Sequence, residues 1–173
     1  DIKHNRGLCV FDIHHDLIPV IQKHIPNHRK KDIVYLDIPN SEMNLGYNPL
    51  RKVSYEKRSL VANSLLEAFQ KLFASAWGVR LENILRHILL TLLDQPKVNI
   101  RDIVRIIQDP KYLKGCIPNI VNPDIKRFWL QEFPKYSKHD LVPIVGKVSA
   151  LLAHPAVKRV LIENKKTISL RQI

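Results

Sequence analysis

The chain has 173 residues, of which 45% are hydrophobic and 25% are charged, so it is long enough to form a globular domain with its own core. Lysine and arginine number 28 against 16 acidic residues, and the net charge of +12 favours a polyanionic partner such as nucleic acid or anionic lipid. No apolar run reaches membrane-spanning length, and two cysteines, Cys9 and Cys116, fit a reducing compartment better than a disulfide scaffold.

Two short apolar runs near the start of the chain predict buried β-strands. Residues 7–13 (GLCVFDI) and 32–38 (DIVYLDI) are each about one strand long and are apolar throughout rather than alternating. The segment between them predicts a short helix, which His15 or Asp16 can cap and which has Pro19 near its first turn. A strand, a helix and a second strand form a βαβ unit, in which the two strands are parallel.

Each predicted strand ends in an acidic residue, Asp12 in the first and Asp37 in the second. In a parallel pair the carboxyl ends of both strands lie at one edge of the sheet, where open α/β sheets bind ligands. His14 and Asp16 follow Asp12 directly, so they share this edge. The sequence therefore predicts a ligand-binding edge, for which the alternative is a set of side chains that cap the following helix.

Residues 38–54 form a linker rich in turn residues, and helical patterns follow it. Asn122 and Ser137 are expected helix caps, while Pro143 and Gly146 weaken the helical pattern around them. Apolar spacing or capping signals predict helices within residues 55–73, 77–96, 100–110, 110–117, 122–133, 137–153 and 154–164. We therefore expect a mainly α fold, in which a βαβ fragment precedes a compact all-helical domain of about six or seven helices.

The sequence lacks the phosphate-binding loop of P-loop ATPases. Its one Gly-Lys pair, Gly146-Lys147, is followed by Val148, and Leu141 stands at the position of the first glycine. No G-x-G-x-x-G pattern is present either, so we expect no nucleotide to be bound by this chain alone.

Two sets of residues were considered as metal ligands. Asp12, His14 and Asp16 share one turn, and His139-Asp140 with His87 resembles part of the ligand set of a helical metal-dependent phosphohydrolase. Neither set supplies the three or four clearly grouped ligands that a metal site requires. We expect no metal site, and a phosphohydrolase stays an alternative function.

The basic residues occur in small groups along the chain rather than in one basic tail. A solvated helix face is the ordinary explanation for any one group, but their sum is large for this length. A stand-alone, basic helical module that binds nucleic acid is therefore a second alternative function. The residues that we expect to contact DNA phosphates are Arg29, Lys30, Lys31, Lys57, Arg58, Lys158 and Arg159.

Five segments resemble, in the same order, segments of the HerA/TraG-like DNA-translocating ATPases of the FtsK–HerA superfamily, which include conjugative-transfer ATPases of type IV secretion. FDIHHDL is similar to a strand followed by D-P-H-G-D-L, and IVYLDIPNSEMNLGYNPL to a second strand and an N-P-L turn. FASAWGVRLENILRHILLTLLD is similar to W-G-P-R-L-E-x-x-L-R, and IKRFWLQEF to a segment ending in F-W-x-x-E-F. Residues 154–173 are similar to the segment that closes the family's helical insert.

The resemblance implies that residues 1–54 are a partial RecA-like α/β segment, with two parallel strands, one helix and a linker. Residues 55–165 would be the all-helical insert domain, and residues 166–173 a return strand or a tail. The phosphate loop precedes these segments in the family and the Walker B strand follows them. We therefore expect this chain, which does not begin with Met, to be a piece of a longer ATPase and not to be catalytic alone.

The same resemblance implies that the longer protein binds ATP and Mg²⁺, acts on DNA and self-associates as a hexamer. It would be cytoplasmic, or held at the inner membrane through the parent protein or a secretion complex. Asp12, His14, Asp16 and Asp37 would then lie at the nucleotide-side edge of the sheet.

Arg80 and Glu82 follow Trp77-Gly78, and the resemblance implies an intersubunit or nucleotide-sensing role for them. The alternative is an exposed charged pair whose members do not touch. The chain departs from the family's pattern at Ile13 and Val79, where the pattern has proline, and at His15, where it has glycine. A histidine at that turn puts in doubt any role that needs close approach to its backbone.

Overall fold

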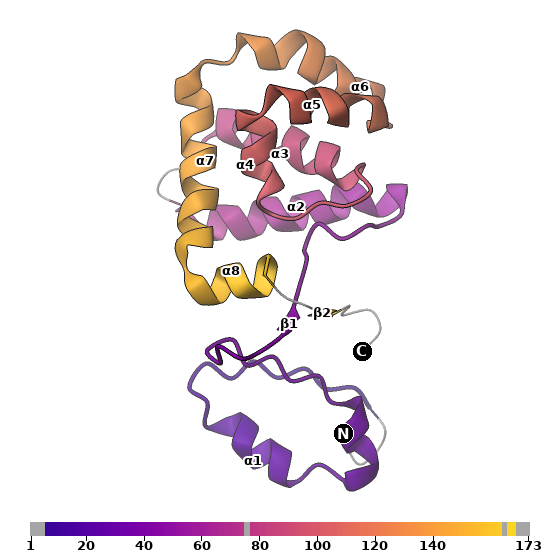
Figure 1. Ribbon diagram of the computed structural model, residues 1–173, viewed down its shortest axis with the longest axis vertical. Helices are drawn as coiled ribbons and strands as arrows, with labels where there is room; N and C mark the ends of the chain where they lie inside the picture. Colours follow the sequence, from indigo (N-terminus) through magenta and orange to yellow (C-terminus); the bar gives the residue numbers. More distant parts are fainter. Residues whose placement is uncertain (1–5, 75–76, 164–165, 169–173) are drawn as a thin grey trace. The chain divides into compact units, whose positions relative to one another are not determined.

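The computed structural model describes residues 6–74, 77–163 and 166–168 of a chain that divides into two compact units (Figure 1). The smaller unit comprises residues 1–37 and 169–173, and the larger comprises residues 38–168. The described structure is mainly helical, which confirms the predicted class. Within the described residues the sheet is one parallel pair of two-residue strands.

The smaller unit contains the helix α1 (Leu17–Lys23) and the 3₁₀ helix η2 (Asn27–Asp32). The helix predicted after the first apolar run is therefore confirmed, with Pro19 in its first turn. The two predicted strands are wrong, because residues 7–13 and 33–37 belong to no strand. A strand requires a neighbour that accepts and donates its ladder hydrogen bonds, and neither run has one within residues 6–74, 77–163 and 166–168.

None of the described residues 6–37 is buried. Phe11 and Ile13 are each 90% exposed, although they lie in the most apolar run of the unit. The run is apolar as the prediction required, but none of the described residues of this unit covers it.

The larger unit begins with an extended segment that contains the strand β1 (Leu45–Gly46). This strand pairs in parallel with β2 (Lys166–Thr167), so that Leu45 lies opposite Lys166. The predicted return strand thus begins where it was expected, and the rest of it, residues 169–173, lies outside the described residues.

The rest of the predicted linker packs on the helices and belongs to the same unit. The Asn48 amide donates to the carbonyl of Val98 over 2.7 Å, and its oxygen accepts the N–H of Leu50 over 3.0 Å. Leu50 and Val53 are buried in the core. The N-P-L turn therefore fixes the entry of the chain into the helical region.

The core of the larger unit forms around α3 (Val79–Leu93), against which α2 (Tyr55–Leu72) packs. Ile84, Ile88, Leu89 and Leu92 on α3 have no exposed surface. Burial of such a side chain contributes about 1.5–3 kcal/mol relative to exposure, which makes this helix the main source of core stability. Both helices confirm the predicted segments, and α3 ends three residues before Pro96, as expected.

Two short helices follow, α4 (Asp102–Gln108) and α5 (Pro110–Cys116), and η4 (Ile117–Asn119) closes this part. Acidic side chains accept backbone N–H groups at the start of both α-helices. Asp102, the first residue of α4, accepts the N–H of Asn99 over 2.8 Å. Asp109 accepts the N–H groups of Lys111 and Tyr112 over 3.0 and 3.1 Å. These hydrogen bonds satisfy backbone donors that have no partner within a helix.

The helix α6 (Pro123–Arg127) continues into a π-helix, η5 (Phe128–Glu132), and then a 3₁₀ turn, η6 (Phe133–Lys135). Asn122 caps α6 by accepting the N–H of Asp124 over 2.8 Å, as predicted. Phe128 is fully buried and stacks on His87 of α3, with ring centroids 3.8 Å apart. The π-helix thus packs the Phe128 ring, which also contacts the Trp129 ring, against α3.

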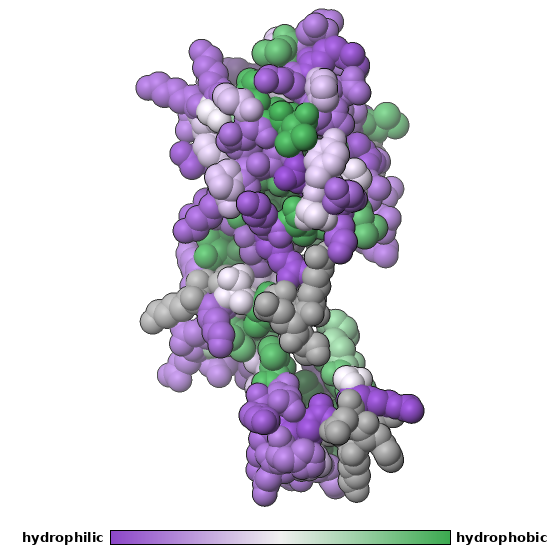
Figure 2. All heavy atoms as spheres, turned by 90° about the vertical axis from the view of Figure 1, so that its right-hand side faces the viewer, coloured by the Kyte–Doolittle hydropathy of each residue, from purple (hydrophilic) through white to green (hydrophobic). Residues whose placement is uncertain are grey.

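The last helices are α7 (Lys138–Ala153) and α8 (Pro155–Leu161). α7 runs unbroken through Pro143 and Gly146, where the sequence pattern is weak, because Ile144 and Val148 are buried against the core. No single described helix is long and apolar enough to span a membrane, and only α7 and α8 taken together, bent by 98°, meet that criterion. Figure 2 shows a face of the larger unit on which hydrophilic residues surround separate hydrophobic ones.

Thr91→Val tests a buried polar contact between α3 and the π-helix. The indole N–H of Trp129 donates to Thr91 Oγ over 2.7 Å, and Thr91 is fully buried. We expect valine to lower the free energy of unfolding by about 1–3 kcal/mol, because it leaves the indole N–H without a partner. Urea unfolding of T91V, W129F and the double variant measures this loss. The double variant should lose less than the sum of the singles, and strict additivity would contradict the contact.

Candidate functional site

The turn before α1 in the smaller unit is organised by Asp12. Its carboxylate accepts the N–H groups of His15, Leu17 and Ile18 over 2.9, 3.0 and 2.8 Å. These hydrogen bonds, chiefly the one from Ile18, hold the pKa of Asp12 below its ordinary value. The side chain of Asp16, which directly precedes α1, makes no such bond. The capping side chain is therefore Asp12, one turn before the position predicted from the sequence.

His15 has a φ angle of 59°, which places it in the left-handed region. That region favours glycine, because a Cβ atom crowds the backbone there. The turn therefore has a backbone conformation that a glycine would adopt with less strain than His15.

The remaining predicted residues of the nucleotide-side edge also lie in the smaller unit. Asp37 and Asp12 both raise the pKa of the Tyr35 phenol, after the larger effect of desolvation, so both carboxylates lie within electrostatic reach of one hydroxyl. The side chains of His14 and Asp16 are exposed and have no hydrogen-bond partner among the described residues.

The larger unit has a polar hollow of about 380 Å³ at the start of α3. Arg80 comes from the first turn of α3, Glu132 from the π-helix, and Asp140 from the first turn of α7. Lys135 and Tyr136, between η5 and α7, complete the lining. Of the candidate site residues named from the sequence, Arg80 and Asp140 lie here, and the segments WGVRLE and FWLQEF each contribute one wall.

Arg80 and Asp140 form the central ion pair of this hollow, with 2.8 Å between Nη1 and Oδ1. The other oxygen of Asp140 accepts the N–H and the hydroxyl of Ser137, both over 2.8 Å, and so caps α7 as predicted for Ser137. Arg80 first, and then these hydrogen bonds, lower the pKa of Asp140 to about 2. The Arg80 side chain stays 69% exposed, so its guanidinium is accessible from solvent.

Glu82 does not contact Arg80 in any hydrogen bond or ion pair of the described residues. Instead it accepts the indole N–H of Trp77 over 3.0 Å and pairs with Arg86 at 2.9 Å, and the Trp77 bond is the main reason that its pKa is lowered. Arg86 also donates to Asn63 on α2. Glu82 therefore ties Trp77 and α2 to α3, while Arg80 faces the hollow.

Some of the predicted DNA-contacting residues have partners within the protein, and others are exposed. Arg58 forms a mostly buried ion pair with Asp94, and Arg159 donates to the carbonyl of Ile38 over 2.5 Å. Lys158 pairs with Glu163. Arg29 pairs with Asp32 in the smaller unit, and the residues that remain exposed are Lys30, Lys31 and Lys57.

The structure also places the residues weighed above as possible metal ligands. Within the described ranges, no three His, Cys, Asp or Glu side chains gather as a metal-ligand group. Asp140 is occupied by Arg80, and His87 stacks on Phe128 with its Nδ1 2.8 Å from the carbonyl of Asn83. Asp140 and His87 therefore have partners within the fold.

Comparisons of the chain with protein-family models, with curated proteins and with solved structures find no significant match.

The ion pair between Arg80 and Asp140 predicts a pH dependence of stability. The pKa of Asp140, about 2 in the folded chain, lies below its ordinary value of 3.8, so the folded state is favoured above about pH 4. This contribution is lost as the pH falls from about 4 to about 2. We expect Asp140→Asn to remove part of the stability difference between pH 5 and pH 2.5, measured by urea unfolding. The control is Glu67→Gln, an exposed carboxylate on α2, and equal effects of the two variants would contradict the ion pair.

His15→Gly tests the left-handed turn before α1. Glycine relieves a backbone conformation that costs another residue about 1 kcal/mol, so we expect roughly fivefold slower hydrogen exchange at the amides of Leu17 and Ile18. His14→Gly, one residue earlier and without a positive φ, should give no such protection. Equal effects of both variants would show that the turn is not left-handed.

Proposed function

We propose that the chain is the helical insert domain, with an adjoining part of the RecA-like core, of a hexameric ATPase that translocates DNA. Support comes first from the five segments that resemble this family in the same order along the chain. The observation that carries the proposal is that two of them, far apart in sequence, build one site. Arg80 and Glu132 line the same hollow, and His87 stacks on Phe128.

The described part of the smaller unit supports the same proposal, because it contains no buried core residue. Its apolar side chains, such as Phe11 and Ile13, are exposed, and none of the described residues 6–37 is buried. We propose that further strands of a RecA-like sheet cover these runs in the longer protein. Burying such exposed apolar surface stabilises a sheet by about 25 cal/mol per Å².

In that protein a phosphate loop outside these residues would bind ATP with Mg²⁺. The turn made by Asp12 would then lie at the edge of the sheet, with Asp37 near it. The role of Asp12 that fits its hydrogen bonds is to hold the turn, since three backbone N–H groups occupy its oxygens. His14 and Asp16, whose side chains are free of such contacts, are then the groups available to nucleotide or water.

Arg80 is the residue of the hollow that best fits a role between subunits. Its guanidinium is 69% exposed, and its partner Asp140 keeps two hydrogen bonds to Ser137 when Arg80 leaves. An anionic group from a neighbouring subunit or a nucleotide could therefore take Arg80 without leaving Asp140 unsatisfied. We propose the cytoplasm, or the inner membrane through a secretion complex, as the place of action.

A stand-alone basic module that binds nucleic acid is the second candidate, and the net charge of +12 favours it. It differs from the first candidate in needing no phosphate loop elsewhere in the protein. The coding sequence on either side of these residues separates the two.

The proposed function makes two linked predictions. The 173-residue chain should not hydrolyse ATP in the presence of Mg²⁺, because it contains no phosphate loop. The coding sequence should show G-x-x-x-x-G-K-[ST] within about thirty residues upstream, roughly the length of a βαβ unit, and a strand ending in Asp-Glu downstream. Robust hydrolysis by the chain alone, or a start and a stop codon at its ends, would overturn the proposal.

A further inference from the structure

The exposed charged residues of one stretch of the helical unit, residues 96–120, are all basic. They are Lys97, Arg101, Arg105, Lys111 and Lys114, which we call the α4–α5 surface. The two acidic residues of this stretch accept backbone N–H groups, and Asp102 is buried while Asp109 is half-buried. The exposed charge of this stretch is therefore positive, while its two carboxylates accept hydrogen bonds from backbone N–H groups.

Internal partners compensate only one of these five cations. Arg105 lies 3.7 Å from Asp109 and 4.0 Å from Asp102, and its guanidinium stands 4.0 Å from the centre of the Tyr112 ring. By contrast, Lys97 has no carboxylate within ion-pair distance among the described residues, and neither do Arg101, Lys111 and Lys114.

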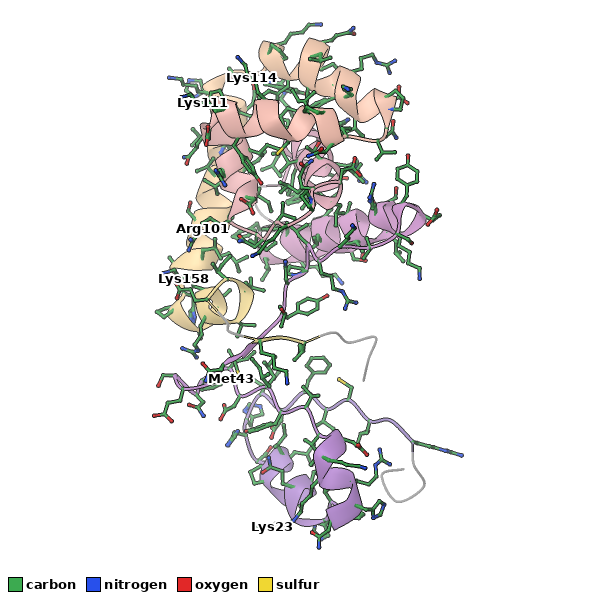
Figure 3. All side chains as sticks on the ribbon, turned by 45° about the vertical axis from the view of Figure 1, so that its right-hand side comes forward. Lys23, Met43, Arg101, Lys111, Lys114 and Lys158 are labelled. Carbon is green, nitrogen blue, oxygen red and sulfur yellow. The ribbon has the colours of Figure 1, made fainter. Side chains whose placement is uncertain are left out.

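These three side chains lie on the same side of the helical unit (Figure 3). Lys111 and Lys114 are one turn apart on α5, and Arg101 immediately precedes α4, which packs against α5. Three uncompensated cations on two packed helices make a surface with positive potential, rather than a single solvated charge.

The same stretch has no exposed large hydrophobic side chain between Pro96 and Ile120. Protein interfaces usually rely on buried apolar or aromatic anchors and are depleted in lysine, so an acidic protein is a poor fit to this surface. Phosphate groups, in contrast, are bound by lysine and arginine through charge and without such anchors.

We propose that the α4–α5 surface binds the phosphate backbone of nucleic acid through Arg101, Lys111 and Lys114, without reading the base sequence. The identity of that nucleic acid as DNA rests on the proposed function. These residues differ from the DNA-contacting residues expected from the sequence. Of those, Arg58, Arg159 and Lys158 already have partners within the protein.

The test compares two variants of the 173-residue chain that lose the same charge. One is Arg101→Gln with Lys111→Gln and Lys114→Gln, and the other is Lys52→Gln with Lys71→Gln and Lys138→Gln, at exposed positions before α2, on α2 and on α7. Fluorescence anisotropy measures their binding to a short DNA duplex of arbitrary sequence from about 50 to about 200 mM salt. Circular dichroism checks that both variants keep the helical content of the parent chain.

We expect the α4–α5 variant to bind at least about tenfold more weakly at low salt, with a slope of log K against log salt that is smaller by about 2–3. The control variant should keep most of the affinity and the slope, and a second duplex of different sequence should bind equally. Equal losses in the two variants, or tighter binding of labelled poly-glutamate than of the duplex, would overturn the proposal. Either result leaves the proposed function standing, since that depends on the phosphate loop in the flanking sequence.

Discussion

The burial of α3 is the constraint on which the rest of the helical unit depends. This helix has apolar residues on more than one side, and four of them are completely excluded from solvent. A short helix is marginal by itself in water, so α3 is stable only because α2, α4, α6 and α7 cover it. The polar side chains that remain on α3 must then lie at its ends or find partners within the core, as Thr91 does with Trp129.

Polar contacts fasten both ends of this buried helix. At its start, Arg80 pairs with Asp140 and the amide of Asn83 donates to the hydroxyl of Tyr136 over 3.2 Å, so two residues of α3 reach the region around the start of α7. At its end, Asp94 pairs with Arg58 of α2 and accepts the N–H of Val121 over 2.9 Å. The hollow with the exposed guanidinium is therefore at the end of a rigid element, which is where a group that must present one fixed geometry is best placed.

The sequence predicted the helices well because their signals are local. Apolar residues at helical spacing and the pair Asn122-Pro123 act within a few residues, and each predicted segment contains a helix. The strands at 7–13 and 33–37 were predicted from the same kind of local signal and were wrong, because a strand depends on a partner elsewhere in space. The pairing of Arg58 with Asp94, 36 residues away, is likewise invisible to local patterns. The hollow was predicted in part. The resemblance singled out Arg80, but nothing in the sequence indicates that Arg80 pairs with Asp140.

The ion pairs of the basic residues decide which positive charges remain available on the surface. Among the ion pairs of the described residues, Lys158–Glu163 is the one that uses a lysine, and the others use arginine, as in Arg86–Glu82 and Arg127–Asp124. The planar guanidinium suits such fixed pairs, while the ammonium of lysine is a strongly hydrated charge on a flexible stem. Most acidic side chains of the helical unit are therefore matched by arginine inside the fold, and the excess positive charge is left largely to exposed lysines. Exposed lysines suit contact with the repeated charges of a phosphate backbone better than they suit base recognition, which requires a fixed geometry. The use of arginine in ion pairs and of lysine on the surface therefore links the stability of the fold to sequence-independent binding.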